Sequence, residues 1–200
     1  MSIRRISSML CTVVCAGLLT LGLSTRQGIA DDKTHEFLPI ADGMIFDQTP
    51  FDGLADGVEE NISNAVFLTS NLGESRVAME FDISPINVQR IESASLRLVP
   101  VGRGILPGTL RVPIQVMGYQ GDGSIQNSDF NSGCFVTVFD ALATPDNVPV
   151  TVDVTEFVRG LSPAKQPVIG FTLRTNVHGS QINYGSVEFG SAPTLIVTLK

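Results

Sequence analysis

Apolar and polar residues alternate along the last third of the chain, and this alternation limits the fold more than any other feature. In segment 148–154 valine occupies every second position, and segments 169–175 and 194–199 repeat the pattern. Neighbouring side chains of a strand point to opposite faces, so a period of two predicts β-strands with one buried face. In the second segment the phase predicts that Phe171 lies in the core.

The same alternation recurs upstream. In segment 77–83 the odd-numbered residues are apolar, which predicts that they face the core and that Ala78, Glu80 and Asp82 face water. With weaker segments included, the chain offers about nine or ten strands, separated by Gly- and Pro-rich turns. This number predicts an all-β fold, an antiparallel two-sheet β-sandwich of jelly-roll-like type.

Helical periodicity does not persist beyond about two turns anywhere in the chain. One short helix is predicted near residues 156–161, with Thr155 as its N-cap and Gly160 as a left-handed stop. Neither an internal repeat nor a linker indicates a second domain. We therefore predict a single β-sandwich domain over residues 31–200.

The first 30 residues have the features of a secretory signal peptide. Arg4 and Arg5 precede an apolar run from Met9 to Leu23, and Gly28-Ile29-Ala30 is a small-x-small cleavage site. The run is short for a membrane span, although an uncleaved anchor helix is the alternative. We predict a secreted protein, extracellular or periplasmic, with no membrane span after cleavage.

The net charge narrows the classes of molecule that the chain is expected to bind. The formal net charge is -7, and removal of residues 1–30, which contain three arginines and no acidic residue, would leave -10. Nucleic-acid binding needs clustered Lys and Arg, so an acidic chain without a basic run argues against it.

Cleavage of the signal segment would also remove Cys11 and Cys15, which leaves Cys134 without a disulfide partner. We expect Cys134 to be a small buried apolar residue.

Four stretches together resemble the DNRLRE family, a group of secreted bacterial β-sandwich modules related to carbohydrate-binding jelly rolls. The resemblance covers roughly residues 65–200, with these matching residues: Arg76-Val-Ala-Met-Glu-Phe-Asp-Ile83, Ile91-Glu-Ser-Ala-Ser-Leu-Arg-Leu98, Val152-Asp-Val-Thr-Glu-Phe-Val158, and Gly170-Phe-Thr-Leu-Arg-Thr175 with Gly185-Ser-Val-Glu-Phe189 and Pro193-Thr-Leu-Ile-Val197. Members often carry a Trp-rich segment between the second and third stretches, whereas this chain has no tryptophan and has segment 118–130 there. The resemblance implies the fold and an exported location.

Tyrosines are the candidate ligand-binding residues. Jelly-roll modules bind sugars through exposed aromatic faces that stack on the rings. Tyr119 falls on the polar phase of its strand and Tyr184 lies in a polar stretch, so both are predicted platforms. The alternative is that both tyrosines only cover a sheet.

An oxygen-rich loop offers a candidate calcium site. Segment 122–129 contains Asp122 and Asp129, the preferred ligands, with Ser124 and Asn127 between them. A second acidic loop spans residues 47–60. Neither loop has the EF-hand spacing, and ordinary solvated turns explain both equally well. Structural calcium is therefore the one possible cofactor.

Catalytic groups do not converge in the sequence. Beyond the signal segment the histidines are His35 and His178, and neither has the context of an activated nucleophile. The leading hypothesis is a non-catalytic structural or adhesive module of the cell envelope or extracellular matrix. A carbohydrate-binding module for an extracellular polysaccharide is the alternative, and a secreted hydrolase is a third. The expected partners are polysaccharide or envelope proteins.

Overall fold

Antiparallel pairing joins every strand in a computed structural model that describes residues 33–48, 52–60, 64–69, 73–161, 167–188 and 190–200. The predicted signal segment lies outside these residues. None of the helices that they form has the length and apolar character needed to cross a bilayer. The strands make two sheets, so the predicted all-β sandwich is confirmed.

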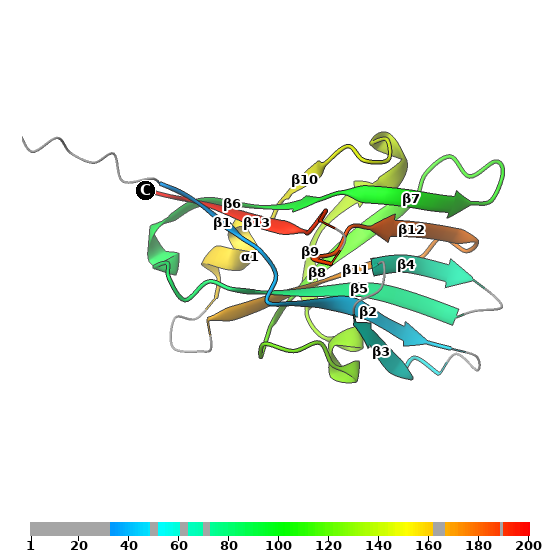
Figure 1. The fold of residues 1–200 in the computed structure, drawn as a ribbon, viewed down its shortest axis with the longest axis horizontal. Coiled ribbons are helices and arrows are strands. Elements are labelled where there is room, and N and C mark those ends of the chain that lie inside the picture. The colour runs from blue at the N-terminus through cyan, green and yellow to red at the C-terminus, as the bar shows by residue number, and fades with distance from the viewer. Residues whose placement is uncertain (1–32, 49–51, 61–63, 70–72, 162–166, 189) are drawn as a thin grey trace, which may run out of the picture. The chain divides into compact units, whose positions relative to one another are not determined.

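The smaller sheet has four strands in the order β1-β13-β6-β10. It brings the start and the end of the described chain together, because β1 pairs with β13 (Figure 1). The central strand β6 carries Leu96 opposite Leu195 of β13 and Val152 of β10. The bounds of the strands are β1 Thr34–Phe37, β6 Ile91–Leu98, β10 Val150–Asp153 and β13 Thr194–Leu199.

The larger sheet has nine strands. Seven follow the order β7-β12-β4-β5-β11-β8-β9, while β2 pairs with β5 and β3 pairs with β2. Figure 1 shows β12, β4, β5, β2 and β3 following one another across this sheet. The bounds are β2 Ala41–Asp47, β3 Gly57–Glu60, β4 Asn64–Thr69, β5 Gly73–Asp82, β7 Pro100–Ile105, β8 Pro113–Gln120, β9 Cys134–Asp140, β11 Val168–Thr175 and β12 Ser180–Tyr184.

The core lies between the sheets and follows the predicted phase. Its buried residues include the odd-numbered residues of 77–83, of 169–173 and of 195–197, together with Leu96 and Leu98. Phe171 has no exposed surface and packs edge-on against Phe81 and Phe157. Val148, in contrast, precedes β10 and is exposed, because the valine alternation begins before the strand does.

Short helices connect the strands: η1 Val88–Arg90, η2 Asn127–Asn131, η3 Ala141–Ala143 and α1 Thr155–Arg159. The predicted caps of the helix near 156–161 are wrong. Thr155 lies inside α1, and its hydroxyl bonds to the backbone of Ala94 on β6 instead of to the helix. Gly160 is right-handed, with a φ of -72°.

The described residues form thirteen strands, more than the nine or ten expected. The difference includes β7, because Gly102 and Gly104 made its sequence resemble a turn. β7 forms in spite of these glycines because they keep the backbone groups that pair with β12, the single neighbour of this edge strand.

Candidate functional site

The outer face of the nine-stranded sheet turns away from the core, and the register decides which side chains meet on it. Arg174 of β11 pairs with Gln115 of β8, and Gln115 pairs with Val138 of β9. Directly paired residues lie on the same side of a sheet. Since Ile114 and Leu173, their neighbours along the strands, point into the core, these three side chains lie on the outer face.

A groove of about 340 Å³ opens beside this row. We call it the arginine groove, and it is lined by Glu74, Arg76, Gln115, Arg174, Thr175 and Asn176. Each arginine is fixed through Nε: Arg174 donates to Gln115 Oε1 at 2.8 Å, and Arg76 donates to Glu74 Oε1 at 2.6 Å. Among the described residues, no acceptor holds the Nη atoms of Arg174. Its fork of donors is therefore oriented and available.

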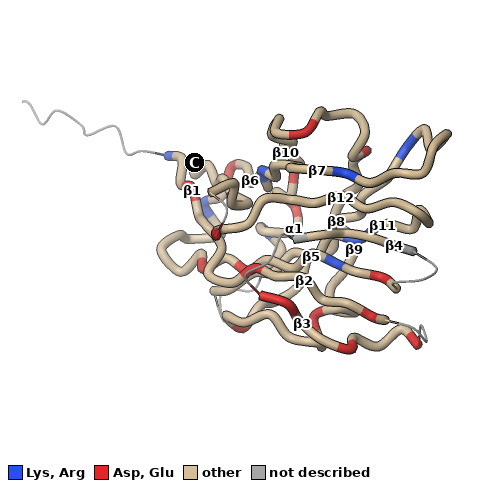
Figure 2. Tube along the Cα trace, turned by 45° about the vertical axis from the view of Figure 1, so that its right-hand side comes forward, with Lys and Arg blue, Asp and Glu red and all other residues tan. Residues whose placement is uncertain are grey.

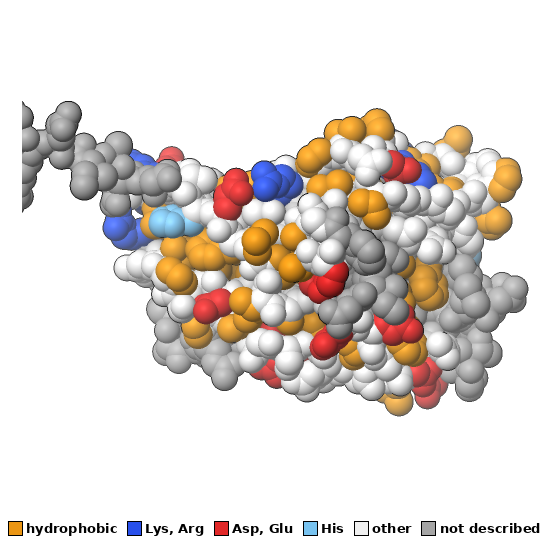
Figure 3. Space-filling view, in the orientation of Figure 1, with side chains coloured by type: hydrophobic (Ala, Val, Ile, Leu, Met, Phe, Trp, Pro, Cys, Tyr) orange, Lys and Arg blue, Asp and Glu red, His pale blue; other side chains and the backbone are white. Residues whose placement is uncertain are grey.

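The arginine groove differs in charge from the rest of the chain. Two arginines and one glutamate line it, in a chain of net charge -7. Acidic residues gather instead along β2, β3 and the neighbouring loops, as Figure 2 shows. In the space-filling view acidic side chains occupy this same part of the surface (Figure 3). An anionic ligand would be favoured at the groove and repelled around β3.

Two exposed apolar residues continue the outer face toward its edge. Phe135 and Val138 of β9 are 57% and 50% exposed. Phe135 reaches this face because a register shift between Val116 and Met117 of β8 places it opposite Met117. The edge strand β9 thus presents an exposed aromatic ring on the face that carries Arg174.

A long connection between β8 and β9 covers another part of the outer face. We call residues 121–133 the strap. Ile125 and Phe130 of the strap pack with Ile45 of β2 and Ala78 of β5 into a second, smaller core. The prediction that Ala78 and Glu80 face water is therefore wrong, because both have no exposed surface beneath the strap.

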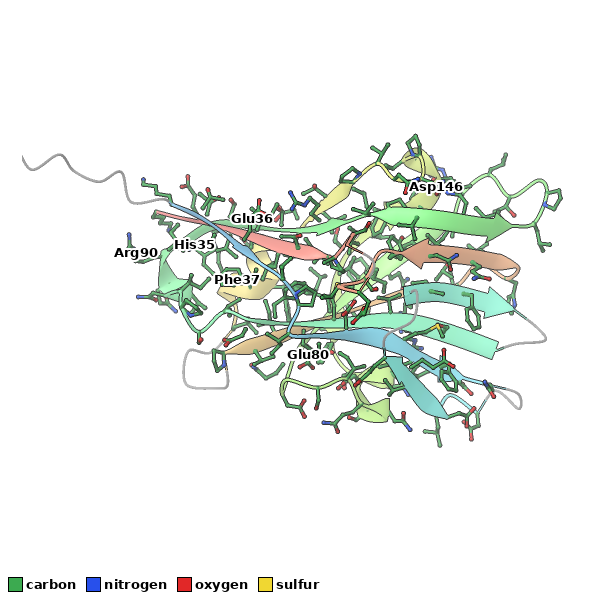
Figure 4. All side chains as sticks on the ribbon, viewed as in Figure 1. His35, Glu36, Phe37, Glu80, Arg90 and Asp146 are labelled. Atoms are coloured by element: carbon green, nitrogen blue, oxygen red, sulfur yellow. The ribbon has the colours of Figure 1, made fainter. Side chains whose placement is uncertain are left out.

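Glu80 is the main buried carboxylate of this region. Its Oε2 accepts hydrogen bonds from the backbone N–H groups of Gly123 at 2.6 Å and Asp122 at 3.2 Å. Figure 4 labels Glu80 on β5. Burial raises the pKa of Glu80 above its ordinary value, and the charges of Asp129 and Asp122 raise it further, against the lowering effect of Gly123 and Tyr119.

The predicted tyrosine platforms are wrong, because both side chains are buried. Tyr119 is 6% exposed: its ring lies against Gly170, where any Cβ would collide with it. Tyr184 is 1% exposed and belongs to the main core. Burial raises the pKa of both tyrosines. The polar neighbours of Tyr119 in the sequence belong to the strap that covers it.

Asp122 and Asp129 lie close enough for the charge of Asp122 to raise the pKa of Asp129, although burial is the larger cause. Each is engaged within the strap. Asp122 accepts from Ser124 and Gln126, and Asp129 accepts from the Gln126 backbone at 2.8 Å. Within the described ranges no three His, Cys, Asp or Glu side chains are arranged to hold a metal ion. Calcium at this loop stays a prediction without structural support.

Two further predicted positions can be compared with the structure. Cys134 is exposed at the start of β9, so its predicted burial is wrong. Cys134 is the first residue of the edge strand β9, and it does not pack on the core as Val136 and Phe139 of the same strand do. His178 is exposed in the turn before β12, while the hydroxyl of Ser180 donates to the Val177 carbonyl at 2.6 Å.

Two other hollows lack the basic side chains that line the arginine groove. One of about 300 Å³ lies between the start of β2 and the strap, and its charged lining, Asp42, Glu60 and Glu188, is acidic. The second, of about 350 Å³, lies between β9 and the β10–α1 region and includes Phe157 and Asp153. Neither lining contains a basic side chain, unlike the arginine groove.

No family model matches the chain, and a search of the curated proteins finds no match. Among solved structures the chain is similar to a mutant xylanase from Cellvibrio japonicus in complex with xylopentaose, with a TM-score of 0.37 and 10% sequence identity. The similarity covers 82% of this chain and 28% of the xylanase chain. A likeness this distant carries no argument about activity or ligand.

Sequence reasoning missed Arg76, Gln115, Arg174 and Phe135. The first three alternate with apolar residues, which indicates an outward position, but nothing along the chain shows that three different strands bring them together. Phe135 carried an available signal, since it belongs to the segment 135–139, whose apolar residues predict a strand. The register shift that turns it outward has no signature in the sequence.

Proposed function

We propose that this chain is a non-catalytic, exported adhesive module that attaches to an acidic polysaccharide through the arginine groove. One observation carries the proposal. The Arg174 guanidinium is held by Gln115 on the outer face, and no acceptor among the described residues holds its Nη groups. A planar guanidinium binds a carboxylate or sulfate through two parallel hydrogen bonds.

Phe135 supports a carbohydrate ligand over a small anion. An exposed aromatic face stacks on a sugar ring and supplies apolar contact at little entropic cost. Phe135 and Arg174 lie on the same face on either side of β8, offset by two residues along it, since Phe135 lies opposite Met117 and Arg174 opposite Gln115. A polymer crossing the strands could meet both residues.

The absence of catalysis, the export and the DNRLRE relationship also belong to this proposal. A hydrolase would need a carboxylate pair or a histidine in a hollow, whereas His178 is exposed in a turn. The arginine groove holds one carboxylate, and Arg76 pairs with it at 2.6 Å. These features favour binding over bond cleavage.

Affinity electrophoresis and calorimetry with a polyuronate, a sulfated polysaccharide and neutral xylan test the proposal. We expect binding to the acidic polymers, weakened by salt because exposed charges are screened. Arg174→Ala should weaken binding roughly 10- to 100-fold, the effect of about 1.5–3 kcal/mol for a hydrogen bond to a charged group. Arg111→Ala is the matched control, since its side chain is 86% exposed and lies outside the groove lining.

A purely structural role is the second candidate. It is favoured by the uncharged run from Cys134 to Phe139 on an edge strand, which leaves backbone groups open to another strand. No binding to any polymer, together with self-association that depends on protein concentration, would favour this role. Equal binding of neutral and acidic polymers, or an unchanged affinity in Arg174→Ala, would contradict the arginine groove as the site.

A further inference from the structure

The strap is fastened to β5 at two places. At one end, the backbone N–H groups of Asp122 and Gly123 donate to Glu80. At the other end, Arg76 Nη1 donates to the carbonyl of Phe130 and to Asn131 Oδ1, and the guanidinium lies 3.8 Å from the centre of the Phe130 ring. Both fastenings use side chains from the outer face of one strand.

The fastening at Arg76 also belongs to the arginine groove. Arg76 lines the groove, yet its Nη1 is committed to the strap. A ligand in the groove therefore meets an arginine whose donors are partly occupied. Release of Phe130 and Asn131 would free these donors and expose the Arg76 side chain, which is 9% exposed in the fastened state.

The fastening at Glu80 is sensitive to charge. The groups that face its carboxylate are the Tyr119 hydroxyl from β8 and the carboxylates of Asp122 and Asp129 from the strap. The residues paired with Glu80 on β11 and β2 are Gly170 and Ala41, which carry no charge. No cation is among the groups that act on it, so an ionised Glu80 is held in a buried, acidic setting.

Two polar atoms beneath the strap are left over. Glu80 Oε1 and the Tyr119 hydroxyl are buried, and neither has a hydrogen-bond partner of standard geometry among the described residues. Buried polar atoms are normally satisfied. The Tyr119 hydroxyl can donate to an ionised Glu80, whereas a proton on Glu80 would remove the buried charge.

We propose that the strap is a proton-controlled restraint on Arg76: ionisation of Glu80 loosens the strap, and the loosened strap frees Arg76 to bind an anionic ligand in the arginine groove. This inference rests on the proposed function for its ligand, while the movement of the strap does not. Glu80 acts as a positioning residue, since it lies outside the groove lining and works through residues 121–133.

The sign follows from the pKa of Glu80. The pKa is raised in the fastened state, where burial disfavours the charge, and returns toward its ordinary value of 4.5 when the strap opens and the carboxyl meets water. The proton therefore binds more tightly to the fastened state. The strap is fastened most firmly below the ordinary pKa and opens more often as the pH rises through the raised value.

Hydrogen exchange of the amides of residues 121–133 tests the strap, with rates corrected for the intrinsic effect of pH. In the wild-type protein we expect protection to fall between about pH 4 and about pH 8, by about tenfold for each unit by which the pKa is raised. Glu80→Gln should abolish this fall, because the amide keeps the size of the side chain and an oxygen acceptor for Gly123 but cannot ionise. Amides of β11 report in the same experiment that each variant is folded.

Polymer binding is measured at the same two pH values, with a polyuronate as the probe. The wild-type protein should bind more tightly at the higher pH, and Glu80→Gln should lose this difference. Strap protection that is independent of pH, or a pH effect that survives in Glu80→Gln, would overturn the inference. If the protein binds polyuronate but strap protection does not depend on pH, the proposed function stands and the inference about the strap is wrong. If strap protection depends on pH but no polymer binds, the strap movement stands and the proposed ligand is wrong.

Discussion

β5 and β6 carry the same alternation, yet their outer faces have different surroundings. On β6 Ser95 and Arg97 are partly exposed, as the alternation predicts. On β5 Ala78 and Glu80 are fully buried, because the strap crosses them. A period of two thus reports which side chains share a face. Whether that face meets water depends on the strap, whose residue Asp122 lies 42 positions after Glu80 in the chain.

Substitution of Phe171 by Ala should have the largest effect, because it probes the inner face that both sheets share. The ring is fully buried, and its centre lies 5.5 Å from that of Phe157 and 6.2 Å from that of Phe81. We expect the free energy of unfolding to fall by about 3–5 kcal/mol, the usual cost of a deleted buried aromatic ring. Denaturant unfolding measures this change, and a loss below about 1 kcal/mol would contradict the assigned core.

Paired arginine substitutions sharpen the comparison of the two outer faces. Arg76→Met on β5 removes the bonds to Glu74, Phe130 and Asn131, and should cost roughly 1.5–3 kcal/mol because charged hydrogen bonds in a buried setting are lost. Arg97→Met on β6 removes a pair with Glu36 whose side chains are 37% and 56% exposed. That pair should be worth about 0–1 kcal/mol. Equal losses in denaturant unfolding would show that the strap does not distinguish the two faces.

The fold could be predicted from the sequence because its cause is local. Alternation at Val77, Leu96 and Phe171 records the amphipathic surface of each strand, and the inner residues found in the core are those that the phase selects. The extra strand β7 was not predicted because Gly102 and Gly104 interrupt the alternation of apolar and polar residues. The expected position of Val148 was wrong because the valine alternation begins before β10 does.

The candidate site could not be predicted in the same way, because its cause is tertiary. Tyr119 has the polar phase of an exposed platform, but it lies beneath a strap whose path is fixed by Arg76 and Glu80. Arg174 of β11 and Gln115 of β8 are neighbours because these two strands pair in the sheet, although β9 and the segments after it separate them in the sequence. Only the register of the folded sheet brings such residues into one groove.

The pH dependence of global stability should be the smallest effect, and it compares a carboxylate on each outer face. Glu80 on β5 is buried with a pKa raised above the ordinary 4.5, whereas Glu92 on β6 is exposed. A group whose pKa is raised on folding contributes stability that is fully present below its unfolded pKa and is lost as the pH rises through the folded value. Wild-type stability should therefore decline, relative to a variant that cannot ionise at position 80, as the pH rises from about 4 toward neutrality.

Glu80→Gln is that variant, and Glu92→Gln is its matched control on the open face. Unfolding free energies measured by denaturant at several pH values should show the wild type and Glu80→Gln closest at low pH, with the variant gaining steadily as the pH rises. The Glu92→Gln protein should follow the wild type, because water solvates that carboxylate in both states. Asp129, whose pKa is also raised, titrates in all three proteins, so its share largely cancels in the comparison. If Glu80→Gln instead lost stability with rising pH as the wild type does, the carboxylate of Glu80 would not be the charge that the strap buries, and the difference between the two faces would lie in packing alone.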